Sequence, residues 1–119
     1  MELNSEKLAL KIVQILDDKK AKDIEVLDIS NVSLLADYFV ICSGNSTTQI
    51  KALADEVEEK LAELGYIPIH KEGYSSSSWI LLDYGEIVVH IFHYESRSFY
   101  NLEHLWSDAR SVDIQAIIN

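Results

Sequence analysis

One stretch of the chain constrains the fold more than any other, because it has the pattern of a helix with a marked start and a marked end. Six apolar residues recur there at helical spacing: Ile50, Leu53, Ala54, Val57, Leu61 and Leu64. Ser46 and Gln49 have the spacing of a capping box, in which each side chain satisfies a free backbone amide. Gly65 suits the position after the last turn, and Pro68 keeps the helix from resuming. The sequence therefore predicts an amphipathic helix whose apolar stripe covers another layer of the fold.

Strand patterns lie on both sides of this helix. Apolar, β-branched runs at residues 24–29 and 38–42 precede it, and a short run at residues 67–70 follows it. Residues 79–82 and 87–92 are two further runs, joined across Asp83-Tyr84-Gly85-Glu86, which is a strong hairpin signal.

Helical spacing also appears near both ends of the chain. The first helix is predicted from Leu8, Ala9, Ile12, Val13, Ile15 and Leu16, with Asn4 or Ser5 as its cap, and the last from Phe99, Leu102, Leu105 and Trp106. Residues 111–119 are expected to form a loose tail. The sequence therefore predicts one α/β (α+β) domain spanning residues 1–119, in the order α-β-β-α-β-β-β-α, with a mixed sheet of about five strands and flanking helices.

The charge balance restricts the class of partner. Asp and Glu number 20 against 10 Lys and Arg, so the formal net charge is −10. Nucleic-acid binders carry basic patches because phosphate contacts supply most of their affinity, so little direct contact with nucleic acid is expected. An acidic chain is kept soluble by its charge, and it meets a basic partner readily. No apolar run approaches the roughly 18–20 residues that span a bilayer, and we expect a cytoplasmic protein.

Candidate reactive side chains do not converge in the sequence. His90 and His93 are three apart on a strand, so alternation points them to opposite faces, and no metal site is expected. Cys42, the one cysteine, lies in an apolar run and is predicted to be a buried structural thiol. Asp83 and Glu86 flank a turn, where acids commonly serve the backbone rather than a metal. We therefore expect no catalytic residue and no cofactor.

Two points about these segments stay open. The start of the central helix, from Ser43 to Gln49, either holds a small anion on its free amides or is simply capped. In the hairpin, a two-residue tip at Tyr84-Gly85 would pair Trp79 with His90 and Leu81 with Val88. It would place Trp79, Leu81, Val88, His90 and Phe92 on one face, which we favour. A three-residue loop ending in Gly85 would separate them. If exposed, that face is a binding surface; if covered by helices, it is core.

The chain resembles the ribosomal silencing factor family, also called the Iojap family. The residues that carry the resemblance begin with Ala36-Asp37-Tyr38-Phe39-Val40-Ile41-Cys42-Ser43-Gly44, followed by Ser46, Gln49, Ala54 and Asp55. The stronger match is the run from Trp79 through Asp83-Tyr84-Gly85 and His90 to Phe92, continued by Glu95-Ser96-Arg97, Phe99-Tyr100, Leu102-Glu103 and Leu105-Trp106. Glu86 stands where the family more often has an aspartate.

The resemblance implies a fold similar to nucleotidyltransferases and a function without catalysis. It implies a translational repressor that binds a large-subunit ribosomal protein (L-fourteen in bacterial naming) and sterically blocks joining of the small subunit when nutrients are scarce. Free members of the family commonly form homodimers. On this basis the predicted partner-binding residues are Trp79 as anchor, Leu81, Val88, His90 and Phe92 around it, and Tyr94 and Arg97 at the rim.

Two rival functions remain at this point. One is a nucleotidyltransferase-like magnesium enzyme using Asp37, Asp83 or Glu86, although the chain has no Asp-x-Asp pair and its Ser43-Gly44 reverses the usual Gly-Ser order. The other is a plain homodimerisation or scaffold module whose self-association surface is the Trp79 face.

Overall fold

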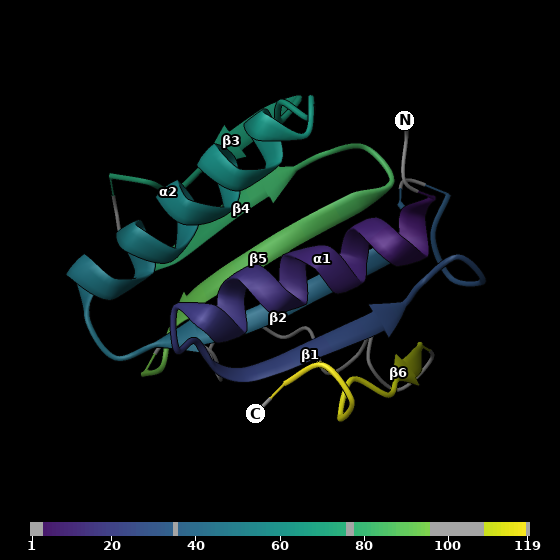
Figure 1. Cartoon of the computed structure of the whole chain (residues 1–119), viewed down its shortest axis with the longest axis horizontal. Coiled ribbons are helices and arrows are strands. Elements are labelled where there is room, and N and C mark those ends of the chain that lie inside the picture. Colours follow the sequence, from purple (N-terminus) through teal and green to yellow (C-terminus); the bar gives the residue numbers. More distant parts are fainter. Residues whose placement is uncertain (1–3, 35, 76–77, 96–108, 119) are drawn as a thin grey trace.

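A six-stranded mixed sheet carries both described helices on one face (Figure 1). The computed structural model describes residues 4–34, 36–75, 78–95 and 109–118. The helices are α1 (Ser5–Asp18) and α2 (Thr47–Glu63). The strands are β1 (Lys22–Asp28), β2 (Tyr38–Gly44), β3 (His70–Glu72), β4 (Trp79–Asp83), β5 (Ile87–His93) and β6 (Arg110–Val112).

The strand order across the sheet is β3-β4-β5-β2-β1-β6. β2 and β5 form the parallel pair at the centre, and every other neighbouring pair is antiparallel. The mixed sheet and the α+β class predicted from the sequence are therefore confirmed. The predicted strand at residues 67–70 lies slightly later, at β3, because Pro68 has no amide to give to a ladder.

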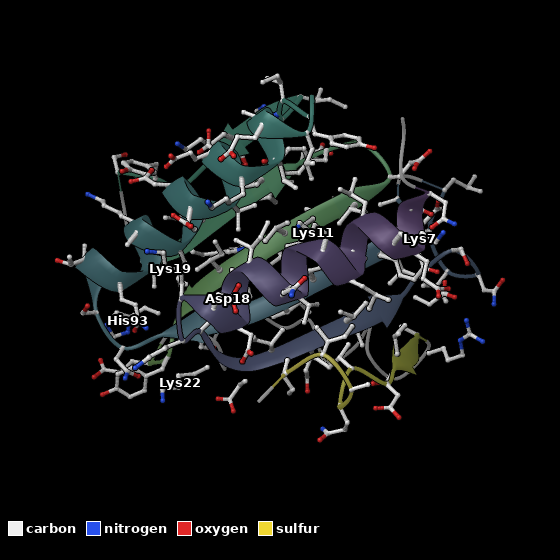
Figure 2. The ribbon with its side chains drawn as sticks, viewed as in Figure 1. Lys7, Lys11, Asp18, Lys19, Lys22 and His93 are labelled. Atoms are coloured by element: carbon white, nitrogen blue, oxygen red, sulfur yellow. The ribbon has the colours of Figure 1, made fainter. Side chains whose placement is uncertain are left out.

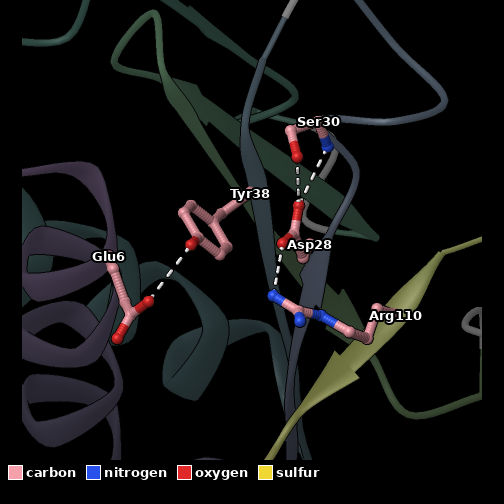
Figure 3. A network of polar contacts seen from close by, with 5 residues as sticks. All are labelled: Glu6, Asp28, Ser30, Tyr38 and Arg110. Carbon is pink, nitrogen blue, oxygen red and sulfur yellow. Dashed lines mark hydrogen bonds and ion pairs between the residues drawn. The ribbon is translucent and has the colours of Figure 1, made fainter.

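The expectation of a loose tail from Ser111 is wrong. Arg110–Val112 pairs with β1 as a sixth strand, and Ile114 is buried against the helical side of the sheet. A three-residue strand is too short to show a period in the sequence, and its attachment depends on a contact distant along the chain. In Figure 3 the Arg110 guanidinium reaches Asp28 on β1, with Nη2 to Oδ2 at 2.8 Å. The predicted helix through Trp106, and Arg97, lie outside the described residues.

Side-chain caps define both helices, as the sequence predicts. Asn4 Oδ1 accepts the Lys7 amide at 2.8 Å, and Ser46 Oγ accepts the Gln49 amide at 3.1 Å. The Gln49 side chain accepts the amide of Asn45, one residue before the cap, rather than that of Ser46. Within the described residues, neither helix is long and apolar enough to cross a bilayer.

α2 ends in a Schellman motif centred on Gly65. Gly65 has φ +92°, the Tyr66 amide donates to Leu61 O at 2.8 Å, and the Gly65 amide donates to Ala62 O at 3.0 Å. The motif turns the chain sharply, so that Tyr66 packs back against the core.

The sheet has a core on each face. The face toward the helices is the larger core and contains Val40, Cys42, Ile80, Leu82, Val89 and Ile91, each fully buried. Cys42 is thus a buried thiol that forms no disulfide, as predicted. The opposite face has a smaller buried cluster: Leu27, Ile29, Ala36, Ile41 and Phe92. Phe39, Trp79, Val88 and Ala109 pack against this second cluster and are partly buried.

Candidate docking site

The register of the β4–β5 hairpin decides which side chains share the sheet face away from the helices. Trp79 pairs with Phe92, Leu81 with His90 and Asp83 with Val88. Direct partners in an antiparallel pair lie on one face. The prediction that Trp79, Leu81, Val88, His90 and Phe92 share a face is therefore confirmed.

The predicted position of the turn is wrong by one residue, and the predicted pairs Trp79–His90 and Leu81–Val88 are wrong with it. The Tyr84 amide donates to Ile87 O at 2.9 Å, so Gly85 and Glu86 form the two-residue tip. Gly85 has φ +89°, a conformation that tyrosine would adopt only with strain. The Gly85 amide donates to Asp83 Oδ1 at 2.8 Å. Asp83 thus serves the turn.

A stacked cluster of rings stands on this face. Trp79 stacks on Phe92 at 5.1 Å between centroids and on His90 at 5.7 Å. Phe39, which β2 places beside Val88 in the parallel ladder, meets the edge of His90 at 4.5 Å. The Trp79 Nε1–H donates to His90 Nδ1 at 3.0 Å. Trp79 is therefore oriented by both packing and a directional hydrogen bond.

His90 is the buried polar member of the cluster. Its side chain is only 3% exposed, and burial lowers its pKa from 6.5 to about 4. Because Nδ1 accepts from Trp79, the neutral ring carries its proton on Nε2. Within the described residues this Nε2 has no hydrogen-bond partner. The imidazole therefore acts here as a neutral acceptor for the indole.

The predicted site residues separate into two layers. Trp79, Leu81 and Val88 are partly exposed, whereas His90 and Phe92 are buried beneath them. Tyr94 is 54% exposed at the end of β5, where its hydroxyl donates to Glu95 at 3.0 Å. Arg97 lies outside the described residues. Sequence reasoning missed Phe39 as a member of the cluster, because only the parallel pairing of β2 with β5 brings it against His90.

The other candidate sites show ordinary structural roles. No cluster of His, Cys, Asp and Glu able to hold a metal occurs among the described residues. At the start of α2, Ser46 and Gln49 already accept backbone amides, so two of the donors that an anion would use are taken. Cys42 is fully buried, which is the environment of an inert thiol.

Comparison with known proteins places the chain among homologues along nearly its whole length. The family model described as ribosomal silencing factor during starvation matches residues 2–119. The ribosomal silencing factor of Halalkalibacterium halodurans is 40% identical over 98% of this chain and 100% of its own length. That of Bacillus subtilis is 47% identical over 87% of each chain.

Solved structures agree with this placement. A crystal structure of a Bacillus halodurans protein superposes with a TM-score of 0.79 at 42% identity, covering 92% of this chain and 99% of that one. Sequence and fold thus point to the same group of proteins. The chain belongs to the ribosomal silencing factor family.

Proposed function

We propose that this protein represses translation by binding the large-subunit ribosomal protein L-fourteen through the Trp79 face and sterically blocking joining of the small subunit under nutrient limitation. The protein would act in the cytoplasm, on free large subunits. Obstruction needs no catalytic group, only a stable contact, and roughly 800 Å² per partner is ordinary for a specific interface.

The observation that carries this proposal is the partly exposed Trp79 held by His90 and Phe92. Tryptophan is the residue most enriched among interface hot spots. A side chain already fixed by stacking and by a 3.0 Å hydrogen bond loses little conformational entropy when a partner covers it. Trp79 is thus built as an anchor before any partner arrives.

The two layers of the site suggest different roles. Leu81 and Val88 are partly exposed on the same face and would contact the partner beside Trp79. His90 and Phe92 are buried, so they would support the anchor from below. Tyr94 and Arg97 would form the rim, where contacts add specificity more than affinity.

Charge favours a protein partner over ribosomal RNA. A chain with net charge −10 is repelled by phosphate but attracted to a basic ribosomal protein, and opposite charge speeds their encounter. Once bound, the acidic remainder of the surface would also oppose an RNA-rich small subunit. The block would then be both steric and electrostatic.

Co-sedimentation with isolated large subunits tests the anchor. Trp79→Ala should weaken binding at least tenfold, since hot-spot truncations cost about 2 kcal/mol or more. Tyr74→Ala is the matched control, because Tyr74 is a partly buried aromatic that packs on the helical side of the sheet. Circular dichroism checks that both variants stay folded. Unchanged binding of a folded Trp79→Ala protein would contradict the assignment.

When free, the chain is proposed to pair with a second copy through the same apolar face. Burying Trp79 and its neighbours in a homodimer would keep that surface from water until a subunit is available. One patch serving both uses makes the dimer a competitor of ribosome binding. Sedimentation velocity across a range of concentrations, with and without large subunits, measures whether the two assemblies exclude each other.

A further inference from the structure

A second surface lies at the opposite end of the β4–β5 hairpin from Trp79. Figure 1 shows the start of α1, the end of α2, the β4–β5 connection and the loop before β2 gathered at one end of the molecule. They surround an open hollow of about 860 Å³. Tyr66, Tyr84 and Leu8 contribute its apolar lining, and Asp37 and Glu86 contribute carboxylates. We call this feature the turn-end hollow.

Exposed aliphatic side chains rim the turn-end hollow. Leu34 lines it and is fully exposed, and Ile69 lies over Gly85 at its edge. Ile69 is 73% exposed. Isolated exposed aliphatics are normal on a surface, but a group of them around one hollow marks an interaction site.

The backbone around the hollow is tightly held. The amides of Asp37 and Tyr38 both donate to Glu86 O, at 2.7 and 3.1 Å, which ties the loop before β2 to the hairpin turn. The Ile69 amide donates to Asp83 O at 2.7 Å, and the Schellman motif fixes Tyr66. The rim is therefore a preformed surface, which reduces the entropy lost on binding.

The charge of the hollow selects its occupant. The described lining residues include two carboxylates and no Lys or Arg. Arginine and lysine fit such a lining, because their charged group pairs with the carboxylates while the cation and its apolar stem contact the tyrosine rings. Phosphate would be repelled. A symmetric second copy would set Asp37 and Glu86 near their own equivalents, so like charges would oppose each other.

We propose that the turn-end hollow is a docking surface for a basic protein segment that presents arginine or lysine beside aliphatic or aromatic side chains. The aliphatic neighbours would cover Leu34 and Ile69, and the cation would lie between Asp37 and Glu86. This surface is separate from the Trp79 face and does not depend on the function proposed for that face.

A defined peptide tests the proposal on the full chain. The probe is a fluorescent peptide of alternating leucine and arginine, and its affinity is measured by polarisation. Asp37→Asn with Glu86→Gln should weaken binding at least fivefold, and so should Leu34→Ser with Ile69→Ser. Asp18→Asn with Glu59→Gln is the control, because it removes the same net charge from exposed helix positions outside the hollow and should change affinity less than twofold.

Three results would overturn the proposal. The first is equal weakening by the hollow variants and the charge-matched control, which would mean non-specific attraction to an acidic protein. The second is equal affinity for a leucine–glutamate peptide. The third is self-association in sedimentation velocity that the Leu34 and Ile69 substitutions abolish, which would make a second copy the occupant.

Discussion

The indole Nε1–H of Trp79 on β4 donates to the imidazole Nδ1 of His90 on β5 across 3.0 Å. The two residues are diagonal neighbours on one face of the hairpin, and the imidazole is buried beneath the partly exposed indole. A surface aromatic is thus oriented by a buried acceptor. The anchor role proposed for Trp79 therefore depends on the pairing of β4 with β5, which places His90 next to it.

Substitutions at His90 should separate hydrogen bonding from packing. Asparagine places a carbonyl oxygen close to the position of Nδ1, whereas phenylalanine fills the volume without an acceptor. We expect His90→Asn to keep large-subunit binding within threefold and His90→Phe to lose about fivefold, near 1 kcal/mol for one hydrogen bond. The Trp79 indole proton resonance in NMR should shift upfield in His90→Phe alone. Equal binding by both variants, with the fold intact, would show that the hydrogen bond does not position Trp79.

Stability should fall on mild acidification because of His90. Burial lowers its pKa from 6.5 to about 4, so between these values the unfolded chain binds a proton that the folded chain excludes. The free energy of unfolding therefore has its full value above pH 6.5, where His90 is neutral in both states. It decreases as the pH falls from 6.5 toward 4. From pH 7 to 5.5 we expect a loss of about 1 kcal/mol in the free energy of unfolding. Urea denaturation measures it, and the loss should be smaller in His90→Phe. An identical pH dependence in both proteins would contradict this account.

Two glycines at positive φ should respond very differently to alanine. Gly65 has φ +92° and open space around its α-carbon, so Gly65→Ala should cost about 1 kcal/mol in backbone strain. Gly73 has φ +82°, and an added Cβ would collide with the backbone oxygen of Trp79. Gly73→Ala should therefore cost about 3 kcal/mol or more and should displace the anchor's own backbone. Urea denaturation of the two variants gives the comparison, and equal costs would mean that the approach of Gly73 to Trp79 is not tight.

The sequence supports the fold well where the signals are local. The caps and stripe of α2 and the parity of the hairpin follow from residues close together in the chain. The errors come from longer range. A two-residue shift in the pairing arose because Gly85, not Tyr84, opens the turn. β6 and the place of Phe39 depend on pairings between distant segments, which periodicity does not reveal.

The sequence predicts which residues share this face of the sheet, but it does not predict which of them are buried. Alternation puts Trp79, Leu81, Val88, His90 and Phe92 on one face but cannot say which of them are covered. The structure buries His90 and Phe92 and leaves Trp79, Leu81 and Val88 partly exposed. The turn-end hollow was not predicted, because it is assembled from four segments that no short motif joins.

The attachment of β6 should depend more on Asp28 than on Arg110. Asp28 accepts the Ser30 hydroxyl at 2.6 Å and the Ser30 amide at 3.0 Å as well as Arg110 (Figure 3). The hydrogen bonds from Ser30, with help from Arg110, lower the pKa of Asp28. The Arg110 side chain is 75% exposed, so Arg110→Ala should cost less than about 1 kcal/mol. Asp28→Ala should cost more, since it also removes the two hydrogen bonds that Ser30 donates.

Hydrogen exchange at the amide of Val112, on β6, reports whether this strand stays paired in the two proteins. Faster exchange in Asp28→Ala than in Arg110→Ala is expected. The contribution of Asp28 is present above its ordinary pKa near 3.8 and is lost as the pH falls below it. Equal exchange in the two variants would show that the ion pair, which both remove, holds this corner without help from the Ser30 bonds.

Exposed lysines outside the two proposed surfaces are control positions for the effect of charge on large-subunit binding. Figure 2 shows Lys7, Lys11 and Asp18 along α1, with Lys19, Lys22 and His93 near its far end. The stacked rings around Trp79 and the described lining of the turn-end hollow include none of Lys7, Lys11 and Lys22. Lys11→Ala should therefore leave large-subunit binding within twofold, as measured by co-sedimentation. A tenfold loss would point to contact with RNA through α1.

The central claim is that occupation of the large subunit through Trp79 prevents subunit joining. The most direct measurement mixes purified large and small subunits with increasing amounts of this protein and follows the joined ribosome by sucrose-gradient sedimentation. The account predicts that the natural protein and Tyr74→Ala reduce the joined fraction equally, whereas Trp79→Ala needs at least tenfold more protein for the same effect. Undiminished joining with large subunits saturated by the natural protein, or equal inhibition by folded Trp79→Ala, would contradict it.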